Sequence, residues 1–217
     1  HEGRSAARTQ PLDRIAGARL AGLMLRLLTP DERPALAPRQ PLVWSCPAGL
    51  ENGRAGLRQQ ARRLLCGLLS HYLGLPADGL GLVFEAGEPP RLAARWHNLP
   101  LGLSVSYCAT RAAVAICPGT PIGIDLAQVT PMPDWRPVTR LYLGPAVESR
   151  LALLPPAKRD LQFTQAWAAQ EARLKALGLP LQEWSETLQR GVDEGIARIG
   201  TLTLKEDGLI LALASAS

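Results

Sequence analysis

The chain has 217 residues, of which 47% are hydrophobic and 20% charged, and its net charge is +5 at neutral pH. This composition is typical of a globular protein and excludes a disordered chain. The length suffices for a sizeable core in one domain or two small ones. No apolar run approaches the roughly 18 residues of a membrane-spanning helix, so we expect no membrane contact.

The net positive charge indicates what kind of partner the protein could bind, and the four cysteines indicate its cellular compartment. A net positive charge suits an acidic protein, a phosphate-rich cofactor or a nucleic acid, but a solvated arginine-rich surface explains it equally. The chain lacks a helix-turn-helix signature, zinc-ligand spacing and interleaved aromatics, so we expect no nucleic-acid partner. The cysteines show no C-x-x-C spacing, which indicates buried free thiols and a cytoplasmic protein; they are Cys46, Cys66, Cys108 and Cys117.

The first half of the chain predicts one helix and several strands. Apolar residues recur at helical spacing over Leu57–Leu73, and Gly74 ends that pattern. Alternating residues predict a hairpin from two strands, Leu101–Tyr107 and Ala112–Cys117. We also expect short strands over Leu42–Cys46 and Leu80–Phe84.

The second half predicts a similar mixture after a break at Gly119–Pro121. A short apolar strand, Ile122–Leu126, is followed by a helix that we expect over Leu141–Leu154. A second helix spans Phe163–Gly178, and Gly178 and Pro180 end it. A closing hairpin is predicted from Ile196–Leu204 and Leu209–Ala214.

The helix Phe163–Gly178 carries an acid and a base one turn apart. Its predicted buried stripe consists of Ala166, Trp167, Gln170, Leu174 and Leu177. Glu171 and Lys175 lie on the flank of that stripe, where they could form the floor of a cleft. The alternative is a surface ion pair that contributes only about 0.2–0.5 kcal/mol to stability.

Two motifs together identify a family resemblance. Ile122-Gly123-Ile124-Asp125 precedes a helix that reads Trp167-Ala-Ala-Gln-Glu171-Ala-Arg-Leu-Lys175-Ala-Leu-Gly178. In this order and spacing, the two resemble the surfactin-synthetase type of 4′-phosphopantetheinyl transferase. The resemblance implies an α+β fold of two similar halves in a pseudo-twofold arrangement, with the active cleft between them. We place these halves at residues 11–119 and 120–217.

The resemblance implies an enzyme that moves the 4′-phosphopantetheine arm of coenzyme A onto a serine of an apo carrier protein and releases 3′,5′-ADP. The implied partners are coenzyme A and an acidic carrier protein or carrier domain of fatty acid, polyketide or peptide synthesis. Mg²⁺ is the implied metal, because it takes carboxylate and phosphate oxygens. A fused pseudo-dimer is expected to be a monomer.

The resemblance also assigns roles to particular residues. Asp125 and Glu171 would hold Mg²⁺, and Glu171 would serve as the general base. Lys175 would stabilise the bridging oxygen or protonate the leaving group. The phosphates of coenzyme A would contact Arg58, on the polar face of the first helix, together with Ser106 and Tyr107.

Four positions depart from the family pattern: Glu88 replaces a lysine, Tyr107 a histidine, Ala127 a third acid and Gln170 a lysine. Arg91 is close enough in sequence to replace the lysine missing at position 88. These changes leave open a second hypothesis, a degenerate member that binds coenzyme A or a carrier protein without turnover.

Overall fold

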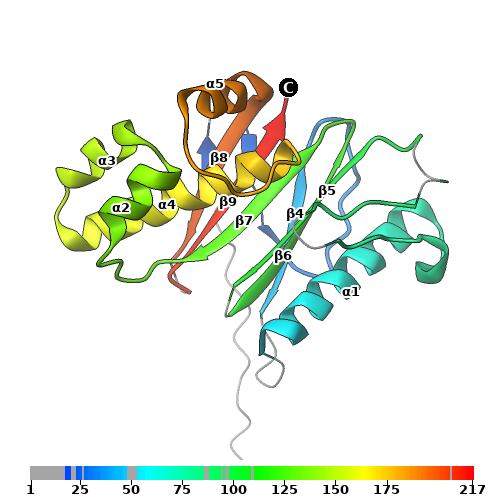
Figure 1. The fold of residues 1–217 in the computed structure, drawn as a ribbon. Coiled ribbons are helices and arrows are strands. Elements are labelled where there is room, and N and C mark those ends of the chain that lie inside the picture. Colours follow the sequence, from blue (N-terminus) through cyan, green and yellow to red (C-terminus); the bar gives the residue numbers. More distant parts are fainter. Residues whose placement is uncertain are drawn as a thin grey trace, which may run out of the picture.

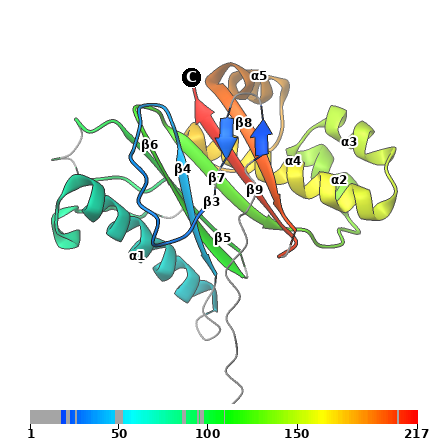
Figure 2. The same cartoon turned by 180° about the vertical axis from the view of Figure 1, so that it is seen from behind.

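Two β-sheets pack face to face, and each carries a long helix on its outer side (Figure 1). The computed structural model describes residues 18–20, 23–25, 27–47, 53–85, 88–93, 95, 98–108, 110–205 and 207–217. The view from behind in Figure 2 shows the same two sheets between α1 and α4. The fold class is therefore α+β, as predicted.

The first sheet has the strand order β3-β4-β6-β5 and is covered by α1. Its pairings are antiparallel except for β3 and β4, which run parallel. A separate two-stranded ribbon precedes it, and a 3₁₀ turn, η1, follows α1. The elements are β1 Ala18–Leu20, β2 Leu23–Leu25, β3 Leu27–Leu28, β4 Leu42–Pro47, α1 Gly53–Leu73, η1 Ala77–Gly79, β5 Leu101–Cys108 and β6 Arg111–Pro118.

The second sheet is antiparallel with the order β7-β9-β8, and α4 covers it. Two short helices precede α4, and another helix leads into β8. The elements are β7 Ile122–Gln128, α2 Trp135–Tyr142, α3 Pro145–Ala152, α4 Pro156–Ala176, α5 Glu186–Gly195, β8 Ile196–Leu204 and β9 Leu209–Ala216.

The two sheets share one connectivity. In each, a strand leads to a 21-residue helix that is followed by two antiparallel strands, and the last strand lies between the other two. In the first sheet this unit is β4, α1, β5 and β6, and in the second it is β7, α4, β8 and β9. The sequence-based division into halves at residue 120 stays a prediction, although the repeated connectivity agrees with it.

Three sequence-based elements are wrong. Leu80–Phe84 forms no strand; a single bridge joins Val83 to Arg91, where Pro89 and Pro90 cannot donate to a ladder. The helix expected over Leu141–Leu154 is interrupted: α2 ends at Tyr142 and α3 begins at Pro145, because Gly144 between them has a φ of 86°. Residues 135–140 of α2 were not predicted to be helical.

The third error concerns α4, which begins at Pro156 rather than Phe163, since a proline is tolerated in the first turn of a helix. The buried residues of α4 also lie on more than one side of the helix, whereas a single buried stripe was predicted. Ala168, Ala172 and Ala176 pack on β9, and Phe163 packs with α2 and α3 on another side. Ala166 and Trp167 are only partly buried.

Helix α5 escaped the sequence analysis although its start carries a signal. The Ser185 hydroxyl accepts a hydrogen bond from the Leu188 amide at 3.1 Å and caps the helix. Serine is among the preferred residues at this position, so Ser185 was the available cue.

All four cysteines are free thiols, as expected; Cys46 and Cys117 are buried, whereas Cys66 and Cys108 are only partly buried. Burial raises the pKa of the Cys117 thiol to about 11, so it stays protonated near neutral pH. Among the residues described, no helix is both long and apolar enough to cross a membrane.

Candidate active site

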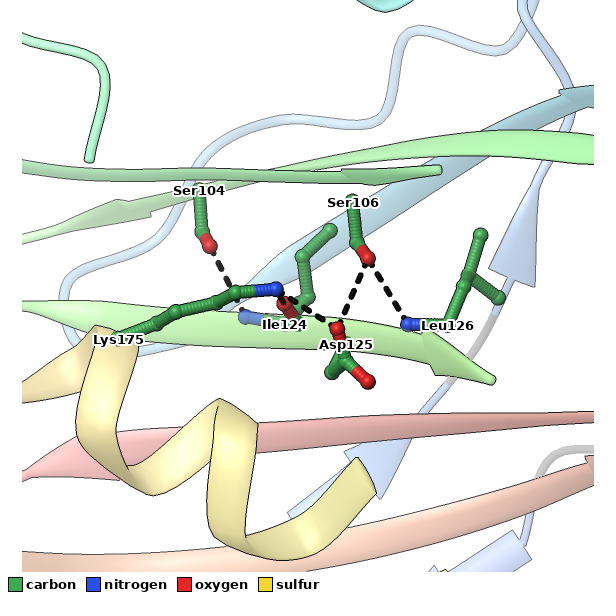
Figure 3. Close-up of polar contacts among 6 residues, drawn as sticks. All are labelled: Ser104, Ser106, Ile124, Asp125, Leu126 and Lys175. Carbon is green, nitrogen blue, oxygen red and sulfur yellow. Dashed lines mark hydrogen bonds and ion pairs between the residues drawn. The ribbon is translucent and has the colours of Figure 1, made fainter. Parts of the chain in front are cut away.

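Asp125 and Lys175 form an ion pair between β7 and α4. Asp125 is 8% exposed, and the Lys175 Nζ lies 2.7 Å from its Oδ1. The same ammonium donates a hydrogen bond to the Ile124 carbonyl at 3.1 Å. Figure 3 shows the lysine reaching along the strand to both oxygens. The structure thus brings together two predicted site residues, one from each of the two sequence motifs.

Gly123 allows this contact because it brings α4 close to the strand. A Cβ at that position would lie 2.0 Å from the Ala172 carbonyl oxygen and 2.5 Å from the Ala176 amide nitrogen. Only a glycine leaves room for the helix backbone at that distance. The glycine of the Gly-Ile-Asp motif therefore sets the distance from which Lys175 reaches Asp125.

Glu171 lies one helical turn before Lys175 and is half-buried. Burial raises the pKa of its carboxyl group; the Lys175 charge lowers that pKa and the Asp125 charge raises it. Within the described part of the chain, the Glu171 carboxylate has no hydrogen-bond or ion-pair partner. A partly desolvated carboxylate beside a second acid has the basicity and the free oxygens that a base or a metal ligand needs.

Ser106 reaches the same carboxylate from β5. Its hydroxyl donates to Asp125 Oδ1 at 3.1 Å and accepts a hydrogen bond from the Leu126 amide at 3.0 Å. Ser104 accepts from the Ile124 amide at 2.9 Å. Ser104 was not predicted from the sequence, although its position two residues before Ser106 places both hydroxyls on one face of the strand.

Tyr107 and Arg58 meet on the opposite face of β5. Neighbouring strand residues point to opposite faces, so Tyr107 turns toward α1 while Ser106 turns toward β7. The Arg58 Nε donates to the tyrosine oxygen at 3.0 Å. The two predicted phosphate contacts therefore pair with each other and not with the Asp125 group.

The other three residues that depart from the family pattern lie away from the Asp125–Lys175 ion pair or make no hydrogen bond to it. Glu88 pairs with Arg91 at 3.0 Å, and Arg91 also pairs with Glu85 at 2.8 Å. Gln170 is 5% exposed, and its amide nitrogen makes no hydrogen bond with any described residue. Ala127 is partly buried against the α4 side of the second sheet.

A cavity of about 460 Å³ opens beside Lys175. Its walls come from the segment at 89–91, the start of β5, the start of β7 and the C-terminal end of α4. Lys175 and Arg91 supply its cationic side chains, and its apolar lining includes Leu101, Ile122 and Leu177. The volume and the mixed lining are typical of small-molecule sites.

The carboxylates of the site fit a magnesium ion whose coordination shell is completed by oxygens of a bound substrate. Within the described residues, no three His, Cys, Asp or Glu side chains gather as a metal cluster. Asp125 and the unpartnered Glu171 offer two carboxylates, and Mg²⁺ commonly uses one or two carboxylates with phosphate oxygens and waters. The two residues therefore suit a metal whose other ligands arrive with a phosphate compound.

Comparison with known proteins points to one superfamily. Residues 121–211 match the family described as the 4′-phosphopantetheinyl transferase superfamily. A protein of Synechocystis sp. (strain ATCC 27184 / PCC 6803 / Kazusa), named provisionally as a 4′-phosphopantetheinyl transferase, is 27% identical over 111 residues. That alignment covers 51% of this chain and 45% of the relative, so the chain spans less than half of the relative's length. Residues 121–211, which carry Asp125, Glu171 and Lys175, are thus similar to the 4′-phosphopantetheinyl transferase superfamily.

Proposed function

We propose that the protein transfers the 4′-phosphopantetheine arm of coenzyme A to a serine of an apo carrier protein and releases 3′,5′-ADP. The observation that carries this proposal is the meeting of Asp125, Glu171 and Lys175, of which Lys175 also lines a cavity of about 460 Å³. The superfamily match covers all three residues. The surfactin-synthetase type is part of this proposal, on the two motifs quoted above.

Asp125 and Glu171 would hold Mg²⁺, which when bound supplies positive charge against the pyrophosphate of coenzyme A. The raised pKa of Glu171 favours a role as general base toward the carrier serine. The serine oxygen then forms a bond to the β-phosphorus, and the bond from that phosphorus to the bridging oxygen breaks. The serine proton goes to Glu171, and the Lys175 ammonium neutralises the charge on the leaving 3′,5′-ADP.

Arg58 is the proposed contact for a phosphate of coenzyme A on the α1 face. Tyr107 occupies only its Nε, so the terminal nitrogens keep their donors, and Arg58 is exposed. A guanidinium presents paired donors that match phosphate oxygens. The tyrosine thus orients a charge that the family's histidine would supply directly.

An acidic carrier protein fits the basic balance of the chain, whose net charge is +5. Helix α1 adds a local source of that charge, because Arg58, Arg62 and Arg63 are exposed and the helix contains no acidic residue. A monomer remains the expected state, since the chain itself repeats the sheet-and-helix unit.

Mass spectrometry tests the function directly. Apo carrier proteins from fatty acid, polyketide and peptide synthesis are incubated with the protein, coenzyme A and Mg²⁺, and we expect the mass of one phosphopantetheine arm to appear on at least one of them. Asp125→Ala and a sample with a chelator serve as controls and should give none. Binding of coenzyme A without modification of any carrier would contradict transfer and favour the degenerate-binder hypothesis.

A further inference from the structure

The strand that carries Asp125 has a free edge, which two serines of the other sheet cover. β7 pairs with β9 alone, so its outer amides have no strand partner in the described sheets. The Ile124 amide donates to the Ser104 hydroxyl at 2.9 Å and the Leu126 amide to the Ser106 hydroxyl at 3.0 Å. Figure 3 shows the two hydroxyls on either side of Asp125.

Both serines are deeply buried, at 2% exposed for Ser104 and 5% for Ser106. A buried amide without an acceptor costs the free energy of its lost hydration. The hydroxyls therefore replace a neighbouring strand, and they hold the first sheet against the second at the residues that flank Asp125.

Ser106 makes one contact that Ser104 does not. Its hydroxyl hydrogen points to Asp125 Oδ1 at 3.1 Å, on the oxygen that also receives the Lys175 ammonium. Asp125 Oδ2 has no hydrogen bond to any described residue. The carboxylate is thus held through one oxygen, and the other is left for a ligand.

A serine hydroxyl has a single hydrogen, and Ser106 uses it on Asp125. We propose that Ser106 is a positioning residue that orients Asp125 toward the metal, and that it does not bind a phosphate of the cofactor. The inference rests on the proposed function, because it takes Asp125 to be a ligand of Mg²⁺. Loss of such a supporting hydrogen bond typically weakens metal binding by about 10–100-fold.

Ser104 and Ser106 form a matched pair for the test, since alanine at either position uncovers one amide of β7 and only Ser106→Ala also releases Asp125. Mn²⁺ binding to the free protein is measured by electron paramagnetic resonance, and coenzyme A binding by calorimetry in a chelator. We expect Ser106→Ala to weaken Mn²⁺ binding by about 10–100-fold relative to Ser104→Ala. Both variants should lose a similar amount of thermal stability, and metal-free coenzyme A binding should not change.

Ser106→Cys keeps the size of the side chain with only a weak donor, and it replaces the alanine variant if that protein does not fold. Equal Mn²⁺ affinity in the two serine variants would overturn the inference, as would weaker coenzyme A binding by Ser106→Ala in the chelator. A wild-type protein that binds no Mn²⁺ would also overturn it. If the wild type modifies no carrier but the Mn²⁺ difference is found, the proposed function fails and the inference stands.

Discussion

At the scale of single residues, the site holds two carboxylates in unequal environments. Asp125 is compensated by the Lys175 ammonium and the Ser106 hydroxyl, whereas Glu171 has no described partner and a raised pKa. Burial is the main cause of that shift, so the ionised carboxylate is less stable in the folded protein than in the unfolded chain. Two acids that differ in this way are suited to different tasks.

Replacing Glu171 should therefore raise stability while it removes activity. A carboxyl whose folded pKa is raised destabilises the fold fully above that raised pKa, and the penalty disappears as the pH falls below the usual value of 4.5. We expect Glu171→Gln to have a higher Tm than the wild type at pH 7, with the gain vanishing near pH 4.5, and transfer about 10²–10⁴-fold slower. Glu183→Gln, at an exposed position, is the control and should match the wild type. An unchanged Tm at pH 7, or wild-type transfer by Glu171→Gln, would count against the assignment.

Lys175 should oppose metal binding in the free protein although it assists transfer. Its ammonium lies 2.7 Å from Asp125 Oδ1, and a second cation must share that carboxylate with it. Unit charges about 4 Å apart near a protein surface interact by about 4 kcal/mol, so even a third of that value changes metal affinity by roughly tenfold. We expect Lys175→Ala to bind Mn²⁺ roughly tenfold more tightly without coenzyme A and to transfer more slowly.

The control for Lys175 is Lys158→Ala, which removes the same charge from an exposed position in the first turn of the same helix. Lys158→Ala should bind Mn²⁺ as the wild type does. Weaker Mn²⁺ binding by Lys175→Ala would show that the lysine supports the metal site rather than competes with it.

At the scale of elements, the approach of α4 to β7 determines the geometry of the site. The helix rests on β9 through Ala168, Ala172 and Ala176, whose small side chains permit close packing. Gly123 allows the same closeness against β7. Helix α4 therefore lies nearer to β7 and β9 than large side chains would allow.

Gly123→Ala should separate these two elements. The new Cβ would lie 2.0 Å from a backbone oxygen that cannot move by itself, so the helix must shift. Overpacking of this kind costs about 1–3 kcal/mol or more, and transfer should fall because Lys175 is displaced from Asp125. Thermal denaturation and the transfer assay measure the two effects.

The matched control is Gly67→Ala in α1, where a Cβ meets no atom within 4 Å. Alanine in an exposed helix is favoured over glycine by up to about 1 kcal/mol, so this variant should be slightly more stable. A Gly123→Ala protein with wild-type stability and activity would refute the close-packing account.

At the scale of the whole molecule, one hydrophobic core joins the two sheets. It contains Val43 and Ala115 from the first sheet and Ile124, Leu211 and Leu213 from the second. The Arg111 guanidinium also pairs with Asp207 at 2.6 Å, which ties β6 to the turn after β8. Neither sheet has its inner face covered without the other.

We therefore expect a single cooperative unfolding transition. Urea denaturation followed by far-UV circular dichroism and by tryptophan fluorescence should give coincident curves, because fully buried Trp44 reports on the first sheet's core and Trp135 on the helices before α4. Separate expression of residues 18–119 and 120–217 should give unfolded or aggregated chains, since each would expose its side of the shared core. Two distinct transitions, or a folded isolated half, would contradict this expectation.

The hydrophobic periodicity of the sequence was sufficient to predict most of the long helices and strands. Alternating residues predicted β5 with β6 and β8 with β9, and helical spacing predicted α1 and most of α4. The elements that failed depend on partners: Leu80–Phe84 has an apolar run but faces prolines that cannot pair, and Gly144 divides a helical pattern. The local sequence pattern indicates which residues are suited to burial, but it does not indicate which residues they pack against.

The sequence by itself determined which residues are candidates for the site, because two motifs at a set spacing contain Asp125, Glu171 and Lys175. The tertiary structure decided how those groups are held. Whether Ser106 faces a phosphate or a carboxylate depends on which strand edge lies opposite β5, and that edge belongs to the other sheet. Likewise, Tyr107 meets Arg58 only because α1 covers that face of the strand. A hydroxyl or guanidinium shows in the sequence what it can donate, but its partner is set by packing between segments far apart in the chain.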